Sequence, residues 1–457
     1  NTTASYNTAV GRDSLAANTT AIENTAVGYA SLFSNTTGAN NVAMGSTTLY
    51  ANTTGANNTG LGKSALAANT TGAANTAVGT DSLKDNTTGT NNVAVGENAL
   101  ANNTTADQST ALGQNALLTN TTGASNVAVG HDSLRLNTTA SNNTAVGTDA
   151  LRVNTTGTEN TAVGSAALDA NTTANSSTAM GYLSLSGNTT GAANTAFGHR
   201  ALLANTTAQY NTAVGQASLE ANTTGAECTA IGRSALGSNT TGSSNTSLGT
   251  YAGLHVTTGG GNTLVGHAAG AQSVNLTTGS NNTIVGFQCR TAASDNDASI
   301  VLGFGVTGVG TRNFTFGDGS TDSNIAAGAT SITAPSDIRL KEDIQDEEVG
   351  LNFINDLRPV TFQWKKEKDI PSEMKAYKEG SEERTMNGKY NHGFIAQEVK
   401  QTIDSHNLKE GFDMWAEDEA DGRQRVAPNA LMSVMVKAVQ ELSTQVDELK
   451  QELKTLK

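Results

Sequence analysis

Asn7-Thr8-Ala9-Val10-Gly11 is the stretch that decides the fold, because it returns every 17 residues. It recurs as Asn24-Thr25-Ala26-Val27-Gly28 and keeps its phase as far as Asn262-Thr263-Leu264-Val265-Gly266, which makes sixteen copies. A fixed short period is typical of stacked repeats, in which each unit buries its apolar face against its neighbours. The sequence therefore predicts an elongated rod.

One unit of the repeat reads Asn-Thr-Ala-Val-Gly-x-x-Ser-Leu-x-x-Asn-Thr-Thr-Gly-x-x. A glycine every few residues argues against helices, since Gly costs about 1 kcal/mol in a helix interior. Short strands separated by Gly and Asn turns fit the pattern better. We expect one coil per unit, with two brief strands, stacked in parallel on the next coil at about 4.8 Å.

The apolar content of one coil is small, because it offers one Val-type residue, one Leu-type residue and small Ala or Ser. Burying the two larger side chains is worth about 3–6 kcal/mol, whereas ordering the coil costs roughly 1–2 kcal/mol for each residue. Three chains that share one apolar axis would bury these side chains more completely. The predicted fold class is therefore mainly β, a trimeric parallel β-roll or β-solenoid, with a single-chain β-helix as the structural alternative.

The repeat resembles the head repeats of trimeric autotransporter adhesins, which carry a similar small-Val-Ala-Ile-Gly cadence. Those repeats are usually a little shorter. The resemblance implies a parallel β-roll that assembles as a trimer.

The Asn-Thr-Thr element, which keeps the same 17-residue phase, has three interpretations. Its side chains could stack in hydrogen-bonded ladders along the rod. Each Asn-x-Thr could instead be an N-glycosylation acceptor on an outward turn, and an ice-binding Thr face is a third reading. The candidate acceptors are Asn1, Asn18, Asn35, Asn52, Asn69, Asn86, Asn103, Asn120, Asn137, Asn154, Asn171, Asn188, Asn205, Asn222 and Asn239.

Composition excludes several classes of function. The formal net charge of -14 argues against nucleic acid as a partner, because phosphates need clustered Lys and Arg. No apolar run approaches the roughly 20 residues that span a bilayer, so we expect no membrane insertion. Cys228 occupies a repeat position that is usually Asn, which indicates a structural role rather than a redox role. The sequence suggests no metal site and no cofactor.

The composition changes near residue 335, because all 4 prolines and both tryptophans lie at or beyond Pro335. Before this point the repeats become irregular: Gly253 and Gly270 replace the usual Leu, and three residues are inserted before Leu276. We expect a shaft over 1–270, irregular terminal coils and a linker over 271–335, a small α+β domain over 336–430 and a coiled-coil helix over 431–457.

Two motifs lie beyond this boundary, Ser336-Asp337-Ile338-Arg339-Leu340-Lys341 and His392-Gly393-Phe394-Ile395-Ala396-Gln397-Glu398-Val399. Together with Asn429-Ala430-Leu431 and the helix that follows, they resemble the intramolecular chaperone domain at the end of phage tail spikes and fibres such as endosialidases. The resemblance covers about 120 residues. One departure is Pro428, where that family often has an aromatic residue.

The resemblance implies a domain that trimerises, helps the preceding β-fibre to fold and then cuts itself off. Carried onto this chain, the scissile bond is Pro335–Ser336, with Ser336 as the nucleophile and Lys341 as the general base. A Ser hydroxyl needs a base to become nucleophilic, and a Lys is a base near neutral pH only when desolvation lowers its pKa. Burial in an assembled trimer would supply that desolvation. The six residues alone, without the resemblance, favour another interpretation, in which Ser336 is a helix N-cap and Lys341 a solvated charge.

The C-terminal residues predict a coiled coil, because apolar side chains alternate spacings of three and four over about three and a half heptads. A single amphipathic surface helix is the other reading. The seam consists of Met432, Met435, Val439, Leu442, Val446, Leu449, Leu453 and Leu456.

These observations favour a structural and adhesive function: the shaft of a viral tail fibre or spike, assembled as a homotrimer by a self-cleaving chaperone. The alternative is an extracellular or cell-surface filament adhesin, with N-glycans on the Asn-Thr-Thr sites. Both would place the rod on a virion tail or at a cell surface, facing a glycan or protein receptor. A glycan hydrolase would need paired carboxylates in a groove, and the repeats hold no recurring pair. The only enzymatic activity expected is self-cleavage.

Overall fold

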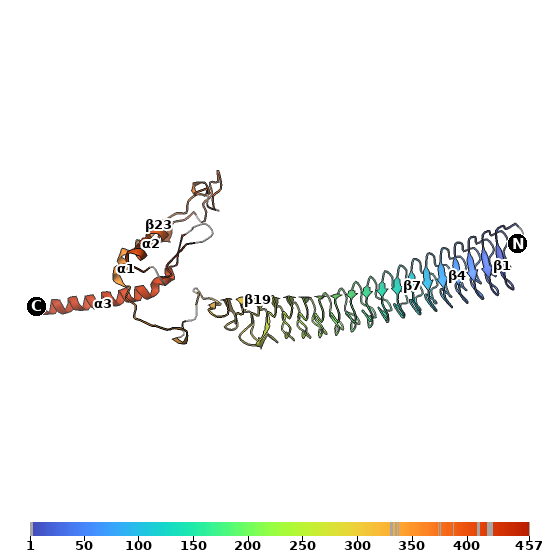
Figure 1. The fold of residues 1–457 in the computed structure, drawn as a ribbon, viewed down its shortest axis with the longest axis horizontal. Helices are drawn as coiled ribbons and strands as arrows, with labels where there is room; N and C mark the ends of the chain where they lie inside the picture. Colours follow the sequence, from blue (N-terminus) through green and yellow to red (C-terminus); the bar gives the residue numbers. More distant parts are fainter. Residues whose placement is uncertain are drawn as a thin grey trace. The chain divides into compact units, whose positions relative to one another are not determined.

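The computed structural model describes residues 3–329, 332–333, 336, 338–372, 374, 376–386, 388–408, 412–417 and 424–456. The chain forms two compact units, Asn1–Pro335 and Ser336–Lys457. The first unit is built from strands and turns, and the second combines short strands with helices (Figure 1).

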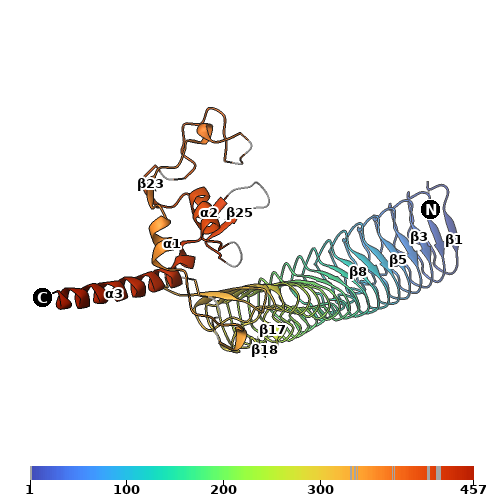
Figure 2. The ribbon, with the colours of Figure 1, turned by 60° about the vertical axis from the view of Figure 1, so that its left-hand side comes forward.

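Each 17-residue unit of the first part is one coil that carries a single three-residue strand, so the second strand expected for each coil is not formed. Neighbouring coils pair in parallel and in register, as in Ala9↔Ala26 and Val10↔Val27. Figure 2 shows the resulting stack of open coils. The strands are β1 (Thr8–Val10), β2 (Thr25–Val27), β3 (Val42–Met44), β4 (Thr59–Leu61), β5 (Thr76–Val78), β6 (Val93–Val95), β7 (Thr110–Leu112), β8 (Val127–Val129), β9 (Thr144–Val146), β10 (Thr161–Val163), β11 (Thr178–Met180), β12 (Thr195–Phe197), β13 (Thr212–Val214), β14 (Thr229–Ile231), β15 (Thr246–Leu248) and β16 (Thr263–Val265).

The core of the rod closes within one chain. Ala26 and Leu32 are fully buried, and their counterparts in the following coils behave alike. Val27 lies on the outer face, because successive side chains of a strand point to opposite sides and Ala26 takes the inward place. The expectation that the Val-type residue fills the core is therefore wrong, and so is the argument that three copies must share one interior.

The Leu of each coil has a left-handed backbone, with φ of 49° at Leu32 and 53° at Leu66. A left-handed L-residue costs roughly 1–2 kcal/mol, which complete burial of the side chain offsets. The Gly of each coil is needed for a different reason. Gly28 has φ of 133°, and a Cβ there would lie 2.3 Å from the carbonyl oxygen of Gly45 in the next coil.

The last coils depart from the repeat but remain packed. The inserted residues form a hairpin of β17 (Ala271–Gln272) and β18 (Val274–Asn275), and the stack resumes with β19 (Thr283–Phe287), β20 (Ile300–Phe304) and β21 (Asn313–Gly317). These strands continue the parallel register. β22 (Ser323–Ala326) then pairs with β21 in the antiparallel direction and covers the edge of the sheet.

The second unit is a small α+β domain with a core of Phe353, Leu357, Val399, Ile403, Met414, Leu431 and Val434. Among the described residues, no helix is both long enough and apolar enough to cross a membrane. Its elements are η1 (Ile338–Leu340), α1 (Leu351–Asp356), β23 (Val360–Phe362), η2 (Glu367–Asp369), β24 (Asn391–Gly393), α2 (Ala396–Ser405), β25 (Trp415–Glu417), β26 (Gln424–Val426), η3 (Pro428–Ala430) and α3 (Leu431–Thr455).

Candidate functional site

Ser336 and Lys341 lie in contact, as a nucleophile and its base must. The short helix η1 turns the chain between them, and the backbone amide of Lys341 donates to the carbonyl of Ile338 at 3.2 Å. Nζ of Lys341 then donates to Oγ of Ser336 at 2.8 Å. General-base catalysis requires a contact within this range between the base and the proton that it removes.

Both side chains of the pair are exposed in the single chain. A Lys accepts a Ser proton only when its neutral form is favoured, and burial is what favours the neutral form. The single chain thus supplies the geometry of the pair without supplying the desolvation. Pro335, on the acyl side of the expected scissile bond, lies outside the described residues, as does Asp337.

The second of the two C-terminal motifs, residues 392–399, spans β24 and the first turn of α2. Glu398 of this motif pairs with Arg358, whose Nε donates to Oε2 of Glu398 at 2.9 Å and whose second nitrogen bonds the other oxygen. The bond and the positive charge of Arg358 lower the pKa of Glu398. This exposed pair joins α2 to the chain before β23. No sequence signal pointed to Arg358, which lies 40 residues away.

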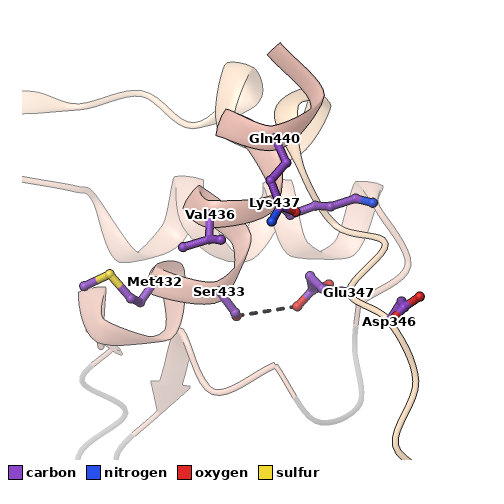
Figure 3. Close-up of a pocket in the computed structure, with 7 residues that line it drawn as sticks. All are labelled: Asp346, Glu347, Met432, Ser433, Val436, Lys437 and Gln440. Carbon is purple, nitrogen blue, oxygen red and sulfur yellow. Dashed lines mark hydrogen bonds between the residues drawn. The ribbon is translucent and has the colours of Figure 1, made fainter. Parts of the chain in front are cut away.

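A groove of about 680 Å³ runs beside the first turns of α3 (Figure 3). Met432, Val436 and Gln440 line it from the helix, and the segment that holds Asp346 and Glu347 faces them. Only one hydrogen bond, from Ser433 to Glu347 at 3.5 Å, links the two sides among the residues drawn. We assign no function to this groove.

Helix α3 has two apolar faces. Leu431, Val434 and Ala438 are buried against their own domain. The eight residues of the predicted heptad seam are exposed instead; Val439, for example, is 65% exposed. An exposed heptad seam on a 25-residue helix is the surface from which a coiled coil is built.

The asparagines of the Asn-Thr-Thr elements form a ladder inside the rod. Nδ2 of Asn52 donates to Oδ1 of Asn35 in the preceding coil at 2.8 Å and to the carbonyl of Gly55 at 2.9 Å. Each of these asparagines from Asn18 to Asn239 is at most 2% exposed. A glycan on Nδ2 would need the space and the hydrogen bonds that the ladder occupies, so the structure favours the ladder interpretation. Asn1 lies outside the described residues.

The residue that precedes each strand, usually Asn, forms a second ladder. Oδ1 of Asn24 accepts the backbone N–H of Asn41 at 2.9 Å, and its Nδ2 donates to the carbonyl of Gly38 at 3.0 Å. Cys228 stands in this column, and its Sγ donates to the carbonyl of Gly242 at 3.3 Å. Burial raises the pKa of the Cys228 thiol, as expected for a structural residue.

His131, Asp132 and Asp149 form the one cluster of potential metal ligands found within the described part of the chain. Arg135 pairs with Asp132 at 3.3 Å and Arg152 with Asp149 at 3.7 Å. Because each carboxylate already faces a cation, we assign no metal to this cluster.

Comparison with known proteins gives one match. Residues 336–408 match the model of the family described as the chaperone of endosialidase. This segment contains Ser336, Lys341 and the motif of residues 392–399, so a β-solenoid of 17-residue coils is followed in this chain by a segment that is similar to the chaperone of endosialidase. No curated protein and no solved structure matches the chain.

Proposed function

We propose that this chain is the shaft of a fibre or spike of the kind carried on a viral tail, built from three copies that the C-terminal unit assembles and then leaves. The observation that carries this proposal is the direct succession of a stacked β-solenoid and a segment that matches the chaperone of endosialidase. Coils that contact only their neighbours make a spacer and a display surface. We place the rod on a virion tail or at a cell surface, where its exposed turns meet a glycan or protein receptor.

Trimerisation is the first part of the proposal, and it rests on α3. The exposed heptad seam leaves eight apolar side chains in water in the single chain. Burial of such a seam between parallel helices is the main source of coiled-coil stability. Each α3 is also attached to its own domain through Leu431 and Val434. Three copies of α3 in a coiled coil would therefore hold the three rods in axial register.

Self-cleavage is the second part. Oγ of Ser336 attacks the carbonyl carbon of residue 335 while Lys341 takes the hydroxyl proton. The peptide C–N bond breaks, the proton passes to the amide nitrogen of Ser336, and the chain is left as an ester on Oγ. Water then hydrolyses the ester, which frees the rod with a new carboxylate. Assembly buries Lys341 and so makes cleavage wait for the completed trimer.

The test is the mass of the purified protein under native and denaturing conditions. For the wild type we expect a native mass of three shafts, without their C-terminal units, and a denatured mass that shows a cut before Ser336. Ser336→Ala should remain full length and still be trimeric, whereas the control Ser433→Ala, elsewhere in the same unit, should be cut like the wild type. A trimeric wild type of full-length mass would contradict self-cleavage, and a monomer would contradict assembly.

A further inference from the structure

The outer face of the strands is a long apolar surface without charge. Each strand of the repeat presents two outward side chains, the first usually Thr and the second Val, Met, Leu, Ile or Phe. None of the strands β1–β16 contains a charged residue. On this face Val10 is 57% exposed, Phe197 49% and Leu248 47%. The other apolar residues at this position are exposed or half-buried, and they repeat on neighbouring strands about 4.8 Å apart. They therefore form an apolar row of the kind that marks an interaction surface.

Several charged residues of the coils lie in the turns next to this face. Glu23, Glu159 and Glu227 come shortly before a strand, and Arg12 and Arg233 follow the Gly after one. An apolar centre with a charged rim is the usual anatomy of a protein interface.

The size of the face matches an interface between subunits. At about 4.8 Å for each strand, the parallel strands extend over about 90 Å. Two outward residues are about 7 Å apart along a strand. The stripe thus covers on the order of 600 Å², and the flanking turns bring it near the roughly 800 Å² that each partner buries in a stable complex.

We propose that this outer strand face is where copies of this chain contact one another along the shaft. The inference rests on the proposed trimer and specifies its surface: three stripes meet at one axis, with the same residue of each copy at the same height. A second copy of the chain fits this face because its coils repeat at the same spacing. The seam of α3 would also set parallel chains in register. A foreign partner would have to match the coil spacing over the whole length.

The outer strand face differs between its two ends. Near the N-terminal end it presents Thr8 and Val10, whereas β20 presents Ile300, Leu302 and Phe304. The larger apolar side chains bury more area when copies meet. Contact between copies therefore begins at the coils nearest in sequence to the chaperone and extends toward the N-terminus.

Cross-linking of the full-length protein, kept uncut by Ser336→Ala, tests the surface. Val146→Cys places a thiol on the stripe, and the native Cys228 and Cys289 are buried. We expect a short bismaleimide to join Cys-substituted chains at position 146 at least tenfold faster than at the control Thr156→Cys, an exposed turn position of the same coil. Equal rates in a protein that is trimeric by native mass would overturn the inference and leave the proposed function standing. A monomeric native mass would remove the trimer itself.

The end of the rod at which association begins is tested by adding one aspartate to the Val146→Cys protein. Leu302→Asp should lower the cross-linking rate at least fivefold, and Val10→Asp, the same charge at the other end, should change it less than twofold. Both positions are exposed in the single chain, so unchanged circular dichroism checks that the coils still form. Equal effects of the two substitutions would show that association does not begin beside the chaperone.

Discussion

Leu264 fills the space that Gly253 leaves in the core of the rod. A Cβ on Gly253 would lie 2.5 Å from Cδ1 of Leu264. In the regular coils the strand contributes Ala to the core and the opposite wall contributes Leu. At the end of the array the two walls exchange these roles, which keeps the core volume nearly constant, as tightly packed interiors require.

This exchange predicts strong coupling between the two positions. Leu264→Ala should cost about 2–5 kcal/mol by leaving a cavity, and Gly253→Leu about 1–3 kcal/mol by overpacking. The double variant restores the arrangement of the regular coils, in which Leu has the same left-handed backbone as Gly253 with its φ of 62°. We expect it to be more stable than either single variant, as measured by denaturant unfolding followed by circular dichroism. Additive losses would contradict the exchange.

The buried ladder predicts that one Asn matters more than its exposed neighbour. Asn103 donates to Oδ1 of Asn86 at 2.8 Å and accepts from Asn120 at 3.2 Å. Asn103→Ala leaves buried partners unsatisfied and should cost about 1–3 kcal/mol. Thr105→Ala, at an exposed position of the same coil, should change stability by less than about 0.5 kcal/mol. The measurement is thermal unfolding of the two variants, and a similar loss for both would argue against the ladder.

The seam of α3 predicts which substitutions dissociate the assembly. In the uncut Ser336→Ala protein, Leu449→Asp puts a charge into the coiled-coil interface and should lower the fraction of trimer, as measured by native mass at low micromolar concentration. Gln451→Asp adds the same charge outside the seam and should leave the trimer intact. If both variants remained trimeric, the seam would not be the contact between helices.

Asp318 predicts a pH effect at the end of the rod. Hydrogen bonds from the hydroxyl and amide of Ser320, and from Thr321, lower the pKa of Asp318 from 3.8 to about 2. A carboxyl with a depressed pKa stabilises the fold at pH values above its unfolded pKa, and this contribution is lost as the pH falls through the folded value. We expect the β21–β22 connection to keep its hydrogen-exchange protection at pH 3 and to lose part of it near pH 2. Asp318→Asn should lack this transition.

The sequence was sufficient to predict the stack of coils, because one exact period leaves little choice of architecture. It could not assign the two sides of the strand. In Thr25-Ala26-Val27 a period of two is satisfied with either Ala or Val inside, and the larger residue was the natural expectation for a core. The left-handed backbone of Leu32 decides the question, because it brings the Leu side chain into the core opposite Ala26. Nothing in the residue type Leu indicates that its backbone is left-handed.

One part of the candidate site could likewise be predicted from the sequence, and another part could not. The family resemblance implied that Ser336 and Lys341 act together, and because they are only five residues apart, one turn of chain brings them into contact. The pairing of Arg358 with Glu398 depends on how α2 packs in the folded domain, which no local pattern encodes. The ladder interpretation of Asn-Thr-Thr could be stated in advance, but only the inward direction of Nδ2 separates it from glycosylation.

The antiparallel strand β22 has a consequence for the length of the molecule. It ends the stack independently of how many coils precede it, and every regular coil touches only its two neighbours. Duplication or deletion of one 51-nucleotide stretch of the gene would therefore lengthen or shorten the rod by about 4.8 Å while leaving its terminus unaltered. Changes in the number of repeats would thus alter the length of the rod in equal steps of one coil.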